Sequence, residues 1–201
     1  MAYNKELIAG KLRRWERYLL RFRLPAWEEI PDIGLYMEQV VELLQGYLDY
    51  MPPELKDEEQ PVTSAAINNY VRRKLLPGPR RKRYWRVHLA YLIMICTLKQ
   101  SLSMSMIQAL LPDGEDETEV REAYESYAAR HNLASRYFVE QVKLASARIL
   151  DHEEETELTV ESTEELICTA AVISGFARLL AEKLILLDER TLADGGSIEV
   201  E

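Results

Sequence analysis

Residues 67–85 read INNYVRRKLLPGPRRKRYW, a stretch with seven Lys or Arg residues and no acidic residue in a chain of formal net charge −9. At 100° per residue, the apolar side chains of its first half fall on one side of a helix and the polar side chains on the other. The polar side carries Asn68, Asn69, Arg72 and Arg73. This pattern predicts a short helix that packs one face on a core and presents hydrogen-bonding and cationic groups on the opposite face.

The second half of the stretch, LLPGPRRKRYW, is too rich in Pro, Gly and charge for a helix. It predicts a tight turn or a small two-stranded hairpin. Four consecutive cations occupy this turn, namely Arg80, Arg81, Lys82 and Arg83. Two interpretations of Tyr84 and Trp85 remain open, because these aromatic side chains could stack on a base of a nucleic acid or anchor the turn to the core.

The charge of the chain is divided sharply along the sequence. Residues 61–112 hold nine basic residues and no acidic one, whereas residues 113–201 hold 8 basic and 22 acidic residues. A local field of this kind favours an anionic partner, with duplex DNA as the leading candidate and RNA or another polyanion as alternatives. The basic segment could instead dock on the acidic half of its own chain or on another protein.

The spacing of Pro, Gly and apolar residues predicts a mainly helical protein of the all-α class. Helices are expected at residues 4–23, 33–50, 63–74, 86–100, 103–111, 118–150 and 163–187. Thr63 and Ser64 are N-cap candidates for the short helix of the basic stretch, and Ser103 for the helix after the central one. Residues 86–100 are apolar almost all round, which is typical of a buried central helix.

The N-terminal helix, residues 4–23, has a heptad-type apolar stripe and several arginines. These arginines are either solvated residues of a helix that packs on a neighbour or an additional arm that contacts phosphates. Three prolines and a charge cluster make residues 51–61 a loop.

No pattern of catalytic residues stands out in the chain. His88, His131 and His152 are far apart and lack a metal-ligand spacing, and the sequence has no glycine-rich phosphate loop or nucleophile elbow. We therefore predict that the protein is not an enzyme and has no catalytic residue, metal site or cofactor. His88 is expected to be a hydrogen-bonded core residue.

The two cysteines, Cys96 and Cys168, lie in apolar sequence without CxxC spacing, which favours reduced thiols in a cytoplasmic protein. The most apolar run, residues 166–187, contains Arg178, Glu182 and Lys183. Charges within a bilayer are costly, so we predict no membrane span.

The order of these features resembles the MerR-type winged helix-turn-helix. The matching positions are Leu75, Leu76, Pro77, Arg83, Tyr84, Leu89, Leu92, Leu102, Ser103, Met104, Ile107, Leu110 and Leu111. The phrase LYMEQVVELL … INNYV … HLAYLIMICTLKQ is further similar to an uncharacterised family of bacterial cytoplasmic proteins, a domain of unknown function found mainly in Firmicutes.

The sequence patterns, together with this resemblance over residues 34–112, predict four regions. They are an N-terminal basic amphipathic helix with its linker (1–33), a MerR-like winged helix-turn-helix domain with a small β-wing (34–112), a helical dimerisation or effector region (113–190) and a disordered tail (191–201). The resemblance also implies a transcription regulator of a bacterial cytoplasm that binds double-stranded DNA as a homodimer and could respond to an unknown small-molecule effector.

The implied DNA-binding residues belong to the short helix and the basic turn. They are Thr63, Ser64, Asn68, Asn69, Arg72, Arg73, Arg80, Arg81, Lys82 and Arg83. The helix would enter the major groove, where Asn suits adenine and Arg suits guanine, and the turn would contact phosphates or the minor groove.

Several residues depart from the MerR pattern. Asn68 and Asn69 stand where that pattern has Arg and Tyr, and the loop 51–62 is longer than the roughly 3–4 residues of a usual helix-turn-helix turn. Lys74 replaces the glycine that usually ends the helix in a left-handed conformation, so the chain there either turns differently or carries strain. These departures favour an alternative function, an all-helical protein-interaction adaptor that keeps a MerR-like core without binding DNA.

Overall fold

The computed structural model describes residues 5–49, 62–145, 168 and 171–180. Its elements are α1 (Lys5–Arg21), the 3-10 turn η1 (Trp27–Glu29), α2 (Met37–Tyr47), α3 (Ser64–Arg72), α4 (Arg86–Leu98), α5 (Met104–Leu110) and α6 (Glu117–Ala145). Residues 171–180 are also helical. The described residues contain no β-strand, so the predicted all-α class is confirmed.

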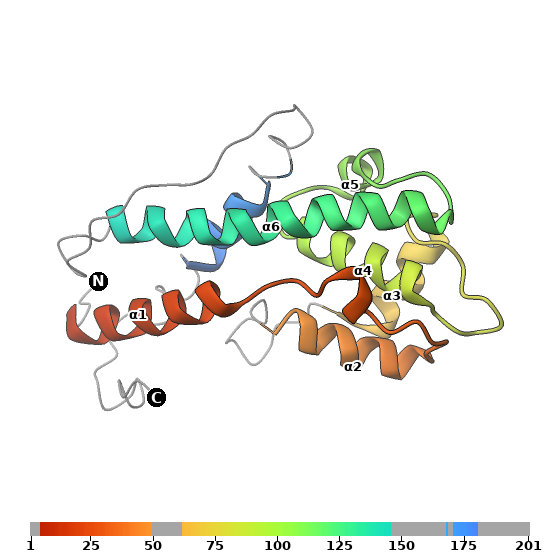
Figure 1. Cartoon of the computed structure of the whole chain (residues 1–201), viewed down its shortest axis with the longest axis horizontal. Coiled ribbons are helices and arrows are strands. Elements are labelled where there is room, and N and C mark those ends of the chain that lie inside the picture. The colour runs from red at the N-terminus through yellow and green to blue at the C-terminus, as the bar shows by residue number, and fades with distance from the viewer. Residues whose placement is uncertain (1–4, 50–61, 146–167, 169–170, 181–201) are drawn as a thin grey trace.

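Helix α4 is the centre of the fold. Every residue from Val87 to Leu98 is buried, as its almost continuous apolar sequence predicts. Helix α2 packs on one side of α4 and α6 on another. Figure 1 shows α6 running along the molecule, beside α1 at one end and beside α4 at the other.

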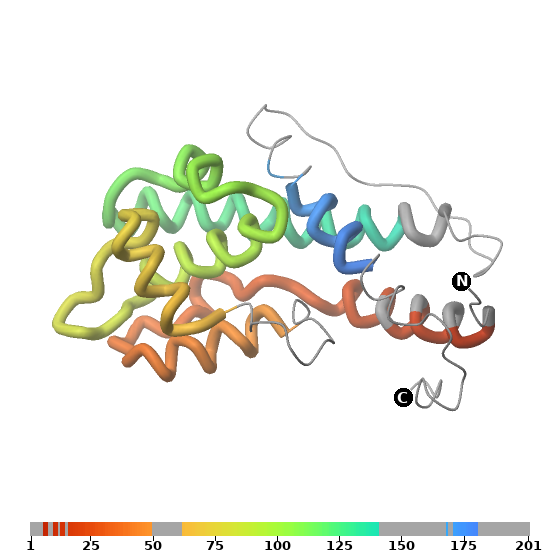
Figure 2. Tube along the Cα trace, turned by 180° about the vertical axis from the view of Figure 1, so that it is seen from behind, coloured from red at the N-terminus to blue at the C-terminus, as the bar shows by residue number. Residues whose placement is uncertain are grey.

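The helix at residues 171–180 packs against the middle of α6 (Figure 2). The ring of Phe176 lies 5.6 Å from that of Phe138 and 5.5 Å from that of His131, measured between centroids. The Ser101 hydroxyl, just beyond α4, donates to the carbonyl of Ala171 at 2.8 Å. One hydrophobic core therefore joins residues from Leu19 in α1 to Leu179.

Side-chain caps begin three of the helices, and those of α3 and α5 lie at predicted places. The Thr63 hydroxyl accepts from the Ala66 N–H at 3.1 Å at the start of α3, and Ser103 caps α5 in the same way. The Asp116 carboxylate accepts from the N–H groups of Thr118 and Glu119, both at 3.0 Å, at the start of α6. Each cap satisfies backbone donors that a helix N-terminus leaves without an internal partner.

Two predictions need correction. The helix expected at 33–50 begins only at Met37, because Leu35 lies in extended chain and pairs with Tyr84 through two backbone hydrogen bonds of 2.8 and 2.9 Å. The expected β-wing has no strand in the described part of the chain. The segment forms a tight turn with isolated antiparallel bridges, Arg80 with Arg83 and Leu35 with Tyr84.

Some predicted elements lie wholly or partly outside the described residues. These are most of the loop 51–62, the end of helix 118–150, much of helix 163–187, and the tail 191–201. Among the described helices, none is long and apolar enough to cross a membrane.

Candidate functional site

Helix α3 has the two faces that its sequence predicts. Ile67 and Tyr70 are buried against the core, whereas Asn68, Arg72 and Arg73 are exposed and Asn69 is half-buried. The Arg72 guanidinium donates to the Asn69 side-chain oxygen at 2.8 Å. The polar face of α3 (Asn68, Asn69, Arg72 and Arg73) is therefore open to solvent, with one side chain already ordered by its neighbour.

Helix α3 ends in a Schellman motif whose left-handed residue is a lysine. The Leu75 N–H bonds the Tyr70 carbonyl and the Lys74 N–H bonds the Val71 carbonyl, both at 3.0 Å. Lys74 itself has φ of 60°. Glycine is usual there because a Cβ makes this conformation unfavourable, so of the two alternatives left open by the sequence, the chain at Lys74 carries strain rather than turning differently.

The basic turn (residues 80–83) is a two-residue hairpin loop. Arg80 and Arg83 exchange two backbone hydrogen bonds of 3.0 Å, and the residues between them, Arg81 and Lys82, have φ of 51° and 63°. Two positive φ values in such a loop belong to a type I′ turn, which strongly prefers Asn-Gly. Within the described residues, three non-glycine residues have positive φ, and all three are cations of the basic stretch 67–85: Lys74, Arg81 and Lys82.

The chain pairing next to the turn sorts side chains onto two faces. Leu35 and Tyr84 point inward and are 8% and 3% exposed, so their neighbours Tyr36, Arg83 and Trp85 point outward. The Arg83 guanidinium lies 4.7 Å from the centroid of the Tyr36 ring and donates to the Tyr36 hydroxyl at 3.0 Å. Sequence reasoning missed this contribution of Tyr36, although Pro31 and Gly34 in its segment are signals of extended chain rather than helix.

The buried His88 side chain hydrogen-bonds to the chain on both sides of the basic turn. Its Nδ1 accepts from the Trp85 N–H at 3.1 Å, so its Nε2 carries the proton and donates to the Gly78 carbonyl at 3.1 Å. Burial lowers the pKa of His88, which favours the neutral ring that this arrangement needs. The prediction of a hydrogen-bonded core histidine is confirmed.

Five cations of the site fall into two groups. Arg80 forms an ion pair of 2.7 Å with Glu115, and Arg83 is held on Tyr36. The exposed side chains of Arg73, Arg81 and Lys82 form no ion pair with any residue that the structure describes. The second group is therefore the more available to an external anion.

The two residues predicted at the start of α3 differ in their roles. The half-buried Thr63 uses its hydroxyl as the helix cap, whereas the Ser64 side chain is exposed. Of these two residues, only Ser64 has an exposed hydroxyl that is not used as the helix cap.

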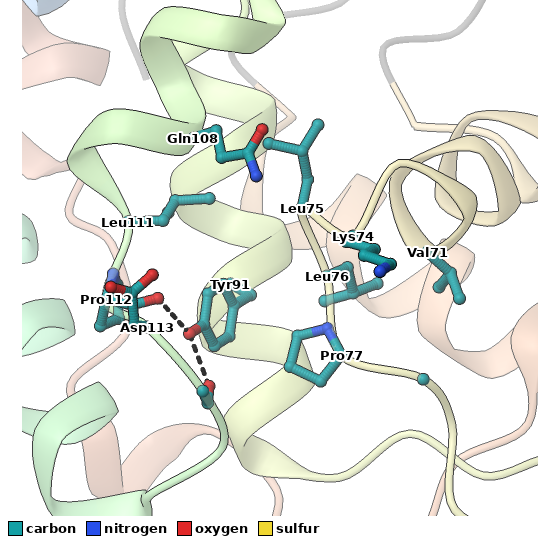
Figure 3. Close-up of a pocket in the computed structure, with 12 residues that line it drawn as sticks. Val71, Lys74, Leu75, Leu76, Pro77, Tyr91, Gln108, Leu111, Pro112 and Asp113 are labelled. Carbon is teal, nitrogen blue, oxygen red and sulfur yellow. Dashed lines mark hydrogen bonds between the residues drawn. The ribbon is translucent and has the colours of Figure 1, made fainter.

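A pocket of about 360 Å³ lies behind the end of α3 (Figure 3). Its walls are residues of the Schellman motif, the end of α5 and the segment before α6, with Tyr91 of α4 between them. The Tyr91 hydroxyl lies 2.7 Å from the carbonyl oxygens of both Pro112 and Gly114. Burial, aided by nearby carboxylates, raises the pKa of Tyr91 to about 12, so the hydroxyl keeps the proton that it donates. The exposed polar side chains of this pocket are Lys74, Gln108 and Asp113.

A second pocket lies where the C-terminal region was predicted to bind an effector. It is lined by Thr97, Gln100, His131, Val172, Gly175, Phe176 and Leu179, and its volume is about 10 Å³. That volume is close to the minimum for one water molecule. Of these two pockets, only the one beside α3 has the size of a ligand site.

Comparison with known proteins gives one result. A family described as a domain of unknown function, DUF1836, matches residues 25–127, just over half of the chain. Searches of the curated proteins and of the solved structures found no match. The matched range includes all of α2 to α5, the basic turn, and α6 as far as Tyr127, whose hydroxyl is hydrogen-bonded to that of Thr97 in α4 at 2.6 Å.

Proposed function

The chain belongs to the DUF1836 family, and we propose that it is a DNA-binding transcription regulator in which α2 and α3 form a MerR-like helix-turn-helix and the basic turn serves as the wing. The proposal rests on the resemblance of the sequence to that motif and on the chemistry of the exposed surface. Duplex DNA is the partner that we expect.

The observation that carries the proposal is the placement of cations at strained backbone positions. A left-handed conformation costs a residue with a Cβ about 1–2 kcal/mol, and Lys74, Arg81 and Lys82 all adopt it. Strained positions of this kind cluster at sites that bind ligands. Three cations at such positions, in a segment without acidic residues, support an anionic ligand at this end of the molecule.

The polar face of α3 has groups suited to reading bases. Asn presents a donor and an acceptor that match adenine N7 and N6, and Arg matches guanine O6 and N7. Asn68 and Arg73 are exposed, and Arg72 is oriented by Asn69. In this arrangement α3 would lie in the major groove, while Arg81 and Lys82 would contact phosphates.

Two further parts of the proposal concern the rest of the chain. We expect a homodimer formed through residues 113–190, because helix-turn-helix modules usually read two half-sites with two-fold symmetry. A small-molecule effector, if the protein uses one, is best accommodated by the 360 Å³ pocket, whose walls include the end of α3.

The test is a titration of a random-sequence duplex by fluorescence anisotropy over a series of salt concentrations. The wild-type protein should bind, and the logarithm of its affinity should fall by about 0.9 per phosphate contact for each unit of log salt concentration. The variant R72E/R73E should bind at least tenfold more weakly with a shallower slope. The matched variant K99E/R136E reverses two exposed charges beyond the far end of α4 and on α6, and it should bind almost like wild type. Absence of binding, or equal loss in both variants, would contradict the proposal.

A second candidate function is the protein-interaction adaptor. It is favoured by the Arg80–Glu115 pair, which shows that the basic turn accepts a carboxylate from a protein segment. An adaptor would keep its protein partner in R72E/R73E and would show no salt-dependent DNA binding in any form. The same titration, with a pull-down of bound proteins, therefore separates the two functions.

A further inference from the structure

A group of exposed aromatic and apolar side chains lies directly beside the basic turn. Ile33, Tyr36 and Trp85 are 61%, 49% and 38% exposed, although Ile and Trp side chains are usually buried. They come from two segments that the Leu35–Tyr84 pairing brings together. We call the set Tyr36, Arg83 and Trp85 the aromatic platform.

The platform is a built surface rather than a chance exposure. Arg83 lies on the Tyr36 ring, and its Nη1 donates to the Gly34 carbonyl at 3.4 Å. A Cβ placed on Gly34 would lie 2.8 Å from Arg83 Cδ and 3.1 Å from Trp85 Cζ2. Because Gly34 has no side chain, the aliphatic part of Arg83 and the indole of Trp85 can both pack against its backbone.

The surroundings of the platform indicate the charge of its partner. Arg81 and Lys82 immediately precede Arg83 in the chain, and both are exposed without an ion pair among the described residues. Two exposed carboxylates, Asp32 and Glu38, lie on either side of Tyr36 in the chain. Phosphates are therefore expected over the turn, while the platform offers flat ring faces and a planar guanidinium.

We propose that the aromatic platform receives an unstacked base of the DNA bound by the basic turn. Aromatic and guanidinium faces are the groups on which proteins stack exposed bases, whatever the base sequence. Trp85 follows Lys82 by three residues, just after the turn, so we expect a phosphate held by Arg81 or Lys82 to bring the adjacent base near Trp85. This inference rests on the proposed DNA binding and adds a preference for duplexes that contain an unpaired base.

The experiment compares a perfect duplex with the same duplex carrying one unpaired 2-aminopurine. Wild-type protein should bind the bulged duplex about tenfold more tightly, the scale of one stacked base, and 2-aminopurine fluorescence should fall on binding. The variant W85L should lose this preference and the quenching, while affinity for the perfect duplex changes less than twofold. Y36L should also lose both, although its loss of the Arg83 contact should weaken binding to the perfect duplex as well. Gly34→Ala keeps all three platform side chains and should reduce the preference by displacing them.

Each outcome has a definite meaning. Equal affinity for the two duplexes, with unchanged 2-aminopurine fluorescence in the wild type, overturns the platform and leaves DNA binding intact. Failure to bind either duplex overturns both proposals. The wild-type measurement needs no substitution, so it stands even if a variant folds poorly.

Discussion

Arg80 and Glu115, 35 residues apart in sequence, form an ion pair in which Arg80 Nη2 donates to Glu115 Oε2 at 2.7 Å. The pair joins the basic turn to the acidic segment that leads into α6. Both side chains remain well exposed, so the pair itself contributes at most about 1 kcal/mol to stability. In the proposed DNA complex, a phosphate near Arg80 would have to compete with the Glu115 carboxylate for its guanidinium.

The first prediction is that Glu115→Gln strengthens DNA binding. Removal of the carboxylate leaves Arg80 available to phosphate, so affinity should rise two- to fivefold at low salt and less at high salt, where screening weakens the competing pair. The free energy of unfolding should fall by less than about 1 kcal/mol. Anisotropy titrations and urea denaturation measure the two effects. Glu117→Gln is the control, because it removes the same charge from a nearby exposed residue that forms no ion pair with a described residue.

The second prediction concerns the left-handed pair in the basic turn. Replacing Arg81-Lys82 with Asn-Gly should raise the free energy of unfolding by about 1 kcal/mol, because Asn-Gly suits a type I′ turn. The same change should weaken DNA binding at least fivefold, because it removes two cations that we propose to contact phosphates. Arg81→Gln with Lys82→Gln is the matched control, since it removes the charges but retains side chains that are strained at positive φ. A double Gln variant that gains as much stability as Asn-Gly would show that the backbone conformation is not the cause.

The third prediction tests the strain at the end of α3. Lys74→Gly should stabilise the fold by about 0.5 kcal/mol, because relief of the left-handed penalty exceeds the entropy that glycine adds to the unfolded chain. Lys74→Ala keeps a Cβ and should give no such gain, although it removes the same charge. Urea denaturation of the three proteins gives the comparison. Equal stability of the Gly and Ala variants would mean that position 74 is not strained.

Local sequence patterns predicted much of this site. The helical period separated the buried Ile67 and Tyr70 from the exposed Asn68 and Arg73, since side chains 3.6 residues apart share a face. Short-range rules also placed the caps at the starts of α3 and α5. These features depend on interactions within a few residues, which a sequence displays directly.

The unpredicted features depend on contacts between distant segments or on backbone strain. The Leu35–Tyr84 pairing holds residues 31–36 out of a helix, and a one-dimensional pattern contains no sign of a partner 49 residues away. Propensity argues against two left-handed residues at Arg81-Lys82, where Asn-Gly would be expected. The Arg80–Glu115 pair is likewise a consequence of how α4 and α6 pack.

The fourth prediction is a loss of stability in acid that depends on His131. This ring is 1% exposed, and burial lowers its pKa from 6.5 to about 4. Between these values the unfolded chain binds a proton that the folded chain does not, so the free energy of unfolding must fall as pH falls. The full effect, from pH 6.5 to about 4, is on the order of 3 kcal/mol. Denaturation curves at a series of pH values measure it.

His131→Phe is the variant that isolates this effect. The ring already lies among Phe22, Tyr127 and Phe176, with centroids 5.5 to 6.1 Å away, so phenylalanine suits the surroundings. At pH 8 both proteins have an uncharged ring at this position and should be folded. From pH 6.5 downward the variant should lose less stability than the wild type. Its phenylalanine cannot take up the proton that His131 binds when the wild-type chain unfolds. Parallel curves for the two proteins over this range would mean that His131 is not the group that titrates.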